Sequence, residues 1–171
     1  MRLFFALWPP APAAAALARW AAETQRETGG RVARSETIHL TLAFLGEVED
    51  QRLQSALAAG QAAGGAPHSL SIDQVRYWEH NRVVWVGPRE TPVPLGALAG
   101  ALRTELLREG FALEKRSFQA HVTVIRNARA PGARPPFPVI AWPVEEFVLV
   151  RSELSGDGSD YECVERFALG R

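Results

Sequence analysis

The hydrophobic and polar positions along this chain follow two different periods. Short apolar or alternating stretches, which are typical of β-strands, occur at 2–8, 37–45, 69–78, 82–86, 118–125, 144–154 and 161–169. Apolar residues at helical spacing follow Pro12 and stop at Gly29, and the same spacing predicts helices over 49–63 and 93–108. Strands and helices therefore alternate along the chain, which predicts a mixed fold.

The two halves of the chain resemble one another in this pattern. Each half contains a predicted helix and a predicted strand with the triplet His-x-Thr, and no clear linker divides them. A length of 171 residues is ordinary for one globular domain. We therefore expect a single domain over residues 1–171, built from two α+β lobes that are related by a weak internal repeat.

Composition narrows the class of protein. Lys and Arg together number 19 and Asp and Glu together number 19, so the formal net charge is zero. Proteins that grip long nucleic acids usually carry a basic excess, whereas a local basic pocket is compatible with this balance. No apolar run reaches the roughly 18 residues of a membrane span, and the apolar start breaks at Pro9-Pro10. We expect a cytoplasmic protein without a membrane segment.

The cysteine count excludes two kinds of structural cross-link. Cys163 is the single cysteine, so the chain can form neither an internal disulfide nor a cysteine-based zinc site. We expect Cys163 to be a small core residue of the strand predicted at 161–169.

Two of the four histidines share a motif. They begin the triplets His39-Leu40-Thr41 and His121-Val122-Thr123, and both triplets lie in alternating apolar segments. Residues i and i+2 of a strand point to the same face, about 6.6 Å apart. Each triplet therefore places an imidazole beside a hydroxyl, while the middle residue points into the core.

This combination of groups indicates chemistry at phosphorus. Histidine titrates near neutral pH, so one imidazole can accept a proton while the other donates one. The hydroxyls of Thr41 and Thr123 can donate hydrogen bonds to non-bridging oxygens as their charge grows. Arg126, five residues after His121, can assist at the end of the strand. We interpret these residues as a candidate phosphoesterase site.

The motif histidines are also compatible with two other roles. A histidine on an alternating strand can be purely structural, and two histidines can belong to a metal site. No Asp, Glu or Cys accompanies either motif at ligand spacing, which argues against a metal. We expect His68 and His80 to face solvent. The tryptophans at 78, 85 and 142 are expected in the core, with a base-stacking wall as the alternative.

At these motifs the chain resembles the 2H phosphoesterase superfamily, and within it the bacterial and archaeal RNA 2′,3′-cyclic phosphodiesterases, also called 2′-5′ RNA ligases. Similar segments follow the family's order over nearly the full length, at 2–7, 38–47, 82–87, 118–126, 147–152, 161–162 and 167–169. The resemblance implies an α+β fold of two pseudo-symmetric lobes of antiparallel sheet. Helices are expected on the outside, and both motifs are expected to line a central cleft.

The resemblance also implies a reaction. Members of this family hydrolyse a 2′,3′-cyclic phosphate at an RNA end to a 2′-phosphate without a metal or other cofactor, and some join or cleave 2′-5′ linkages. By this resemblance His39 is the proton donor and His121 the proton acceptor, while Thr41 and Thr123 hold the phosphate oxygens and Arg126 assists. The implied partners are RNA ends or nucleotides with a 2′,3′-cyclic phosphate. We expect a monomer that needs neither a membrane nor an obligate protein partner.

One departure from the family concerns the second motif. The family usually has proline directly before the histidine, where this chain has Ala120, and Gln119 replaces a position that is often polar or histidine. Neither residue transfers protons, so the departure concerns base preference rather than reaction type. Three alternatives stay open. They are the same chemistry on a small cyclic nucleotide, an ADP-ribose cyclic phosphate or 2′-5′ oligoadenylate; a non-catalytic RNA- or nucleotide-binding module; and a metallohydrolase.

Overall fold

The computed structural model describes residues 1–132, 137–156 and 158–170, and its elements form two larger antiparallel sheets. The first sheet has the strand order β10-β9-β1-β3. Its strands are β1 (Arg2–Leu7), β3 (Leu40–Glu47), β9 (Glu146–Ser155) and β10 (Gly158–Ala168). Because β1 alternates, Leu3, Phe5 and Leu7 point into the core, while Phe4 and Ala6 lie on the opposite face.

The second sheet has the strand order β2-β7-β6-β5. Its strands are β2 (Arg31–Val32), β5 (Gln74–Trp78), β6 (Val83–Gly87) and β7 (Val122–Arg126). A separate ladder pairs β4 (His68–Ile72) with β8 (Ile140–Val144). The two strands that follow the motif histidines, β3 and β7, contact each other across the junction of the two sheets. This junction brings the two halves of the sequence pattern together.

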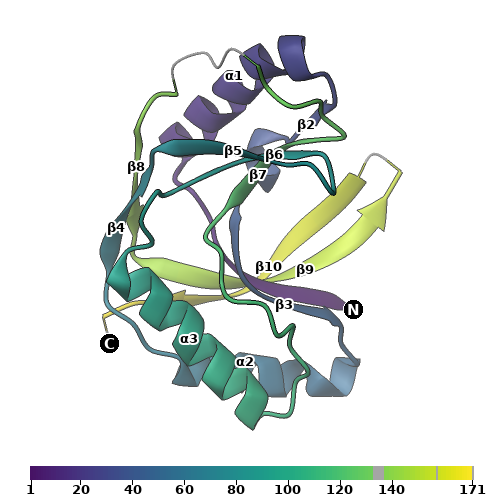
Figure 1. The fold of residues 1–171 in the computed structure, drawn as a ribbon. Helices are drawn as coiled ribbons and strands as arrows, with labels where there is room; N and C mark the ends of the chain where they lie inside the picture. The colour runs from purple at the N-terminus through teal and green to yellow at the C-terminus, as the bar shows by residue number, and fades with distance from the viewer. Residues whose placement is uncertain (133–136, 157, 171) are drawn as a thin grey trace.

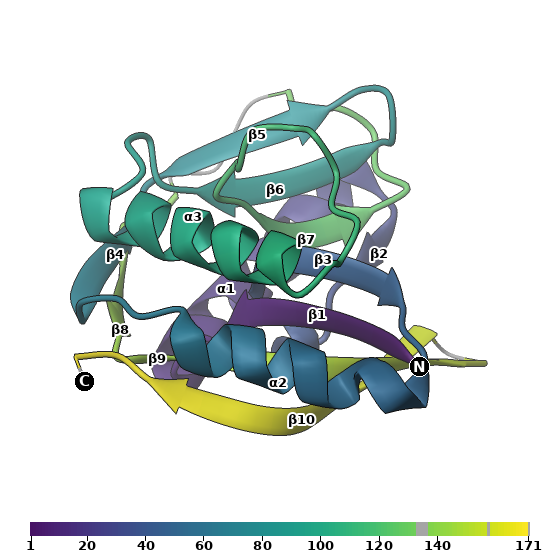
Figure 2. The same cartoon turned by 90° about the horizontal axis from the view of Figure 1, so that it is seen from below.

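The α-helices cover the outside of the sheets (Figures 1 and 2). They are α1 (Ala11–Thr28), α2 (Leu53–Ala62) and α3 (Val93–Arg108). Helix α1 packs near β2, β7 and β8, whereas α2 and α3 pack on each other, with α2 against β10 and α3 against β3. Two short 3-10 helices, η1 (Ser35–Thr37) and η2 (Asp50–Arg52), precede β3 and α2. The expected α+β fold with antiparallel sheets is confirmed.

Several predicted strand boundaries were wrong. The stretch 69–78 is not one strand, because the chain turns at Asp73 and divides it between β4 and β5. There the Asp73 carboxylate accepts a hydrogen bond from the backbone N–H of Arg89 at 2.7 Å. Strand β8 was not predicted, since its Pro143 cannot donate to a ladder and is tolerated here opposite Ser69. The motif strands begin one residue after each histidine rather than before it.

Some predicted environments were also wrong. Cys163 is exposed rather than a core residue, and it lies in β10, which is an edge strand of the first sheet. His68 begins β4 and is half-buried, whereas His80 lies exposed in a turn as expected. Trp85 and Trp142 are buried as expected, but Trp78 is only half-buried. Within the described ranges, no helix is both long and apolar enough to cross a bilayer.

Candidate active site

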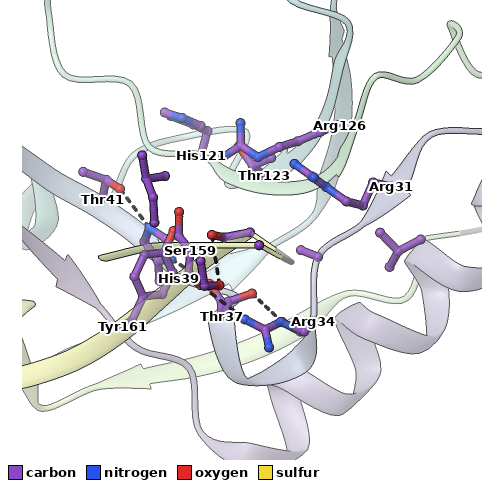
Figure 3. Close-up of a pocket in the computed structure, with 16 residues that line it drawn as sticks. Arg31, Arg34, Thr37, His39, Thr41, His121, Thr123, Arg126, Ser159 and Tyr161 are labelled. Atoms are coloured by element: carbon purple, nitrogen blue, oxygen red, sulfur yellow. Dashed lines mark hydrogen bonds between the residues drawn. The ribbon is translucent and has the colours of Figure 1, made fainter. Parts of the chain in front are cut away.

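A cavity of about 630 Å³ lies where the two sheets meet. Strands of both sheets and the segment before β3 contribute its walls (Figure 3). It is lined by Arg31, Val32, Ala33, Arg34, Thr37, His39, Thr41, His121, Thr123, Arg126, Leu154, Ser155, Gly156, Gly158, Ser159 and Tyr161. All five residues that the sequence singled out as a candidate site therefore line one cavity.

The first motif holds its imidazole in a defined tautomer. His39 Nδ1 lies 2.7 Å from the backbone carbonyl oxygen of Thr37. Because a carbonyl can only accept, Nδ1 carries the hydrogen and donates it. The other ring nitrogen, Nε2, lies 3.1 Å from the Thr41 hydroxyl oxygen. In the neutral ring Nε2 therefore has a lone pair beside this hydroxyl. The alternation of β3 places Leu40 and Leu42 in the core, as expected.

The second motif repeats this arrangement. His121 Nδ1 donates to the backbone carbonyl of Gln119 at 2.8 Å, again two residues earlier in the chain. Its Nε2 is thereby also the nitrogen with the lone pair in the neutral ring. Thr123 lines the cavity, while Val122 and Val124 are fully buried on the other face of β7. Each half of the chain thus supplies one imidazole, and in both rings Nε2 is the nitrogen that can accept a proton.

A β-bulge turns Arg126 toward the same cavity. In the pairing of β6 with β7, Val84 lies opposite Ile125 but Trp85 lies opposite Thr123, so Val124 is the extra residue. Simple alternation from Thr123 would place Arg126 on the core face, because the two are three residues apart. The bulge shifts the alternation by one position. Ile125 is accordingly buried, and Arg126 lines the cavity.

Aromatic rings enclose the His39 imidazole. Trp8 stacks on it with ring centroids 5.0 Å apart and an interplanar angle of 10°. Phe4 lies at 4.9 Å, and Tyr161 meets the ring edge-on at 5.3 Å. Sequence reasoning missed these three residues. They come from β1, the residue directly after it, and β10, which only the strand order brings beside His39.

His121 has a similar but more open environment. Trp78 approaches its ring at 4.7 Å and Trp85 at 6.0 Å, both with steeply inclined planes. Trp78 therefore packs against the His121 imidazole rather than in the core. No sequence signal distinguished it from the buried tryptophans.

These surroundings lower the pKa of both histidines. Burial lowers the pKa of His39 from its ordinary value of 6.5 to about 4. The hydrogen bond to Thr37 opposes this shift, while the positive charges of Arg126 and His121 add to it. Burial also lowers the pKa of His121, opposed by the bond to Gln119 and aided by Arg126. Both imidazoles are therefore neutral near pH 7 in the free protein, and a bound anion would raise both pKa values.

Two further arginines line the cavity and were not predicted. Arg31 lies directly opposite Arg126 in the pairing of β2 with β7. Arg34 donates to the backbone carbonyl of Ser159 at 3.2 Å and forms ion pairs with Asp160 at 3.5 Å and Glu36 at 3.8 Å. Of the described lining residues, three are arginines and none is Asp or Glu. The cavity is thus suited to an anion.

Within the described residues, no group of three or more His, Cys, Asp or Glu side chains comes together in a way that could hold a metal ion. The cavity instead has the composition of a phosphate site, with two imidazoles, two threonine hydroxyls and guanidinium groups. A cleft between two antiparallel sheets, with one His-x-Thr motif from each half, is the arrangement that the resemblance to the 2H phosphoesterases implies.

Comparisons with known proteins agree with this class. The family model described as LigT like Phosphoesterase matches residues 7–85. The RNA 2′,3′-cyclic phosphodiesterase of Escherichia coli is 36% identical over 98% of this chain and 96% of its own length. The enzyme of the same name from Thermus thermophilus is 35% identical over 99% of this chain and 90% of its own.

Solved structures show the same relationship. The crystal structure of E. coli LigT complexed with 3′-AMP superposes with a TM-score of 0.91, at 32% identity over 99% of this chain and 98% of that one. The chain therefore belongs to the LigT-like phosphoesterase family of the 2H superfamily. It is an enzyme of the phosphodiesterase class of hydrolases.

Proposed function

We propose that this chain hydrolyses the 2′,3′-cyclic phosphate at an RNA end to a 2′-phosphomonoester, without a metal, by general acid-base catalysis of two histidines. The observation that carries the proposal is the pair of imidazoles in one cavity, each with Nδ1 committed to a backbone carbonyl and Nε2 left for proton transfer. The curated relatives from E. coli and T. thermophilus are RNA 2′,3′-cyclic phosphodiesterases.

The reaction needs one proton acceptor and one proton donor. His121 Nε2 accepts a proton from water, whose oxygen forms the new bond to phosphorus. The bond between phosphorus and O3′ breaks, and His39 Nε2–H protonates O3′. The product keeps the phosphate on O2′, and the proton that His121 gained replaces the one that His39 lost, through solvent. Thr41 and Thr123 hydroxyls donate to the non-bridging oxygens, and Arg126 balances their charge.

The low pKa of His39 is compatible with the donor role once substrate is bound. A cyclic phosphate is an anion, and an anion beside an enclosed imidazole favours the protonated ring. The same anion offsets the charge of Arg126, which lowers both histidine pKa values in the free protein. The donor therefore acquires its proton together with the substrate. Single variants distinguish the donor from the acceptor. A variant without the acceptor still needs the protonated donor, so its rate should rise as the pH falls.

We propose that the same site can also join RNA ends. If the 5′-hydroxyl of a second RNA replaces water, attack on the cyclic phosphate forms a 2′-5′ linkage and the same two protons move. We further propose that residues 1–171 act as one bilobal domain and as a monomer in the cytoplasm, with RNA ends as the partner and no obligate protein. A small cyclic nucleotide or a 2′-5′ oligonucleotide is the alternative substrate.

The test is release of 2′-phosphate from nucleoside 2′,3′-cyclic phosphates and from RNA with the same end, in excess EDTA. Wild type should be active, and His39→Ala and His121→Ala should each lose at least about 10²-fold in rate. His68→Ala is the matched control, because His68 Nδ1 also bonds a carbonyl two residues earlier, at 2.9 Å, yet lies outside the cavity. Loss of activity in EDTA would support a metallohydrolase. Binding without turnover would support a non-catalytic module.

A further inference from the structure

Among the described residues that line the cavity, the positive charge exceeds what one cyclic phosphate can balance. Arg31 and Arg126 face the same space, and in the described part of the chain neither forms an ion pair. Arg34, by contrast, is balanced by Asp160 and Glu36. During the reaction one imidazole is also protonated. Three positive charges then face a phosphodiester that carries a single negative charge.

The position of Arg31 makes this excess costly without a ligand. Arg31 and Arg126 are directly opposite one another on antiparallel strands, with Cα atoms about 5 Å apart in such a pair. Like charges directly opposite in a sheet destabilise it. Strand β2 has only two residues, so this arginine pair makes up half of its pairing with β7. An anion between the two side chains would offset this repulsion.

The cavity has room for that second anion beyond the histidines. Arg126 influences the pKa of both imidazoles, so it lies within reach of the reacting phosphate. Arg31 lies one strand farther out, on the edge strand of the second sheet. Figure 3 shows Arg31 beside Arg126 on the side of the cavity that holds His121 and Thr123. The second anion would thus lie beside the reacting phosphate, one strand closer to the edge of the second sheet.

The hairpin of β9 and β10 forms the opposite wall of this outer region. Leu154, Ser155 and Ser159 line the cavity there. Arg34 ties the hairpin to the segment before β3 through the Ser159 carbonyl and the Asp160 carboxylate. Leu154 is 75% exposed, which provides an apolar surface between charged groups. An apolar surface between charged groups fits a ligand that combines a sugar or base with a phosphate.

We propose that Arg31 binds the phosphate on the 5′ side of the terminal nucleotide, so that the preferred substrate is an oligonucleotide end rather than a mononucleotide. The proposal rests on the proposed function for the direction of the chain, since the cyclic phosphate at the histidines marks the 3′ end. The next phosphate along the strand is attached to O5′ of the same ribose. That phosphate supplies a second negative charge, which balances the positive charge of Arg31 beside Arg126.

Equilibrium binding tests this site without turnover. The probes are a diadenosine dinucleotide ending in a 2′-phosphate and its analogue with an uncharged methylphosphonate linkage between the nucleosides. Wild type should bind the charged probe about tenfold more tightly, the factor expected from one charge-assisted hydrogen bond. Arg31→Gln should abolish this ratio. Arg31→Lys, which keeps the charge, should retain part of it.

The control variant is Arg76→Gln. Arg76 is an exposed strand arginine of the same sheet, opposite Trp85 and outside the cavity, and its loss should leave the ratio near tenfold. Equal affinity of wild type for the two probes, or an unchanged ratio in Arg31→Gln, would overturn the proposal. Arg31→Gln should also fold, because it removes a like-charge pair; its urea midpoint checks this.

The two proposals can fail separately. If wild type hydrolyses a nucleoside 2′,3′-cyclic phosphate but binds both dinucleotides equally, the reaction stands and the second anion site does not. If no cyclic phosphate is hydrolysed but the tenfold ratio depends on Arg31, the anion site stands and the proposed reaction is wrong. The salt dependence gives an independent check, since one phosphate contact fewer should reduce the slope of log affinity against log salt by about 0.7 for a single strand.

Discussion

Protonation of His39 should destabilise the free protein at mildly acidic pH. The native pKa of His39 is about 4, whereas its ordinary value is 6.5. Between these values the unfolded chain takes up a proton that the native protein does not. Stability therefore rises with pH across this window, and it is lost as pH falls below the unfolded value toward about 4. The physical cause is enclosure by Trp8, Phe4 and Tyr161, which removes the water that would solvate the charged ring.

The size of the effect follows from the pKa difference. One pKa unit corresponds to about 1.4 kcal/mol, and most of the window is crossed between pH 7 and about pH 4.5. His39 alone should thus reduce the free energy of unfolding by about 2 kcal/mol over this range. His121 acts in the same direction, because its pKa is also lowered.

Urea unfolding of wild type and of His39→Asn at the two pH values measures this contribution. The variant cannot titrate at this position, so its stability should fall by about 2 kcal/mol less than that of wild type. An equal fall in both proteins would refute the reasoning. Nuclear magnetic resonance titration of the His39 ring provides a direct control. A native pKa near 6.5 would show that the aromatic rings do not exclude water, and a rise of the pKa with added inorganic phosphate is expected.

Two other predictions concern the motifs and the sheet that supports them. Thr41→Val and Thr123→Val should each lower kcat by about 10²-fold with little change in urea midpoint, because in the proposed reaction each removes a donor to the charged phosphate oxygens; steady-state kinetics on a cyclic phosphate checks this. Gly30→Ala should lower the free energy of unfolding by about 1–3 kcal/mol, because Gly30 has a φ of +86° and an added Cβ would lie 2.4 Å from the Arg126 carbonyl oxygen. A urea midpoint equal to that of wild type would contradict the second expectation.

The local parts of this site could be predicted from the sequence because they depend only on neighbouring residues. The period of two places Leu40 and Val122 in the core, and both are fully buried. The same period leaves Thr41 and Thr123 on the opposite face, where both line the cavity. Helix α3 spans the predicted residues 93–108, since its apolar spacing and its proline in the first turn are also local signals.

The enclosure of His39 could not be predicted in this way, because it depends on strand order. Trp8 follows β1, and Tyr161 lies in β10, more than 150 residues later along the chain. Only the order β10-β9-β1-β3 brings both rings to one face of one sheet beside the start of β3. Sequence patterns identify which face of each strand is apolar but not which strands are neighbours. The low pKa of His39 is therefore a property of topology rather than of the motif.

Arg126 shows how a local irregularity completes the site. Proximity to His121 suggested its role, yet strict alternation from Thr123 would have buried its guanidinium among apolar side chains, where a charge is costly. The extra residue Val124 removes this conflict, since it allows Val124 and Ile125 both to be buried and returns the next side chain to the cavity. Bulges are over-represented next to active sites because they redirect a side chain without changing the sheet. The bulge thus allows one short strand to bury three apolar side chains in the core and to place both Thr123 and Arg126 at the cavity.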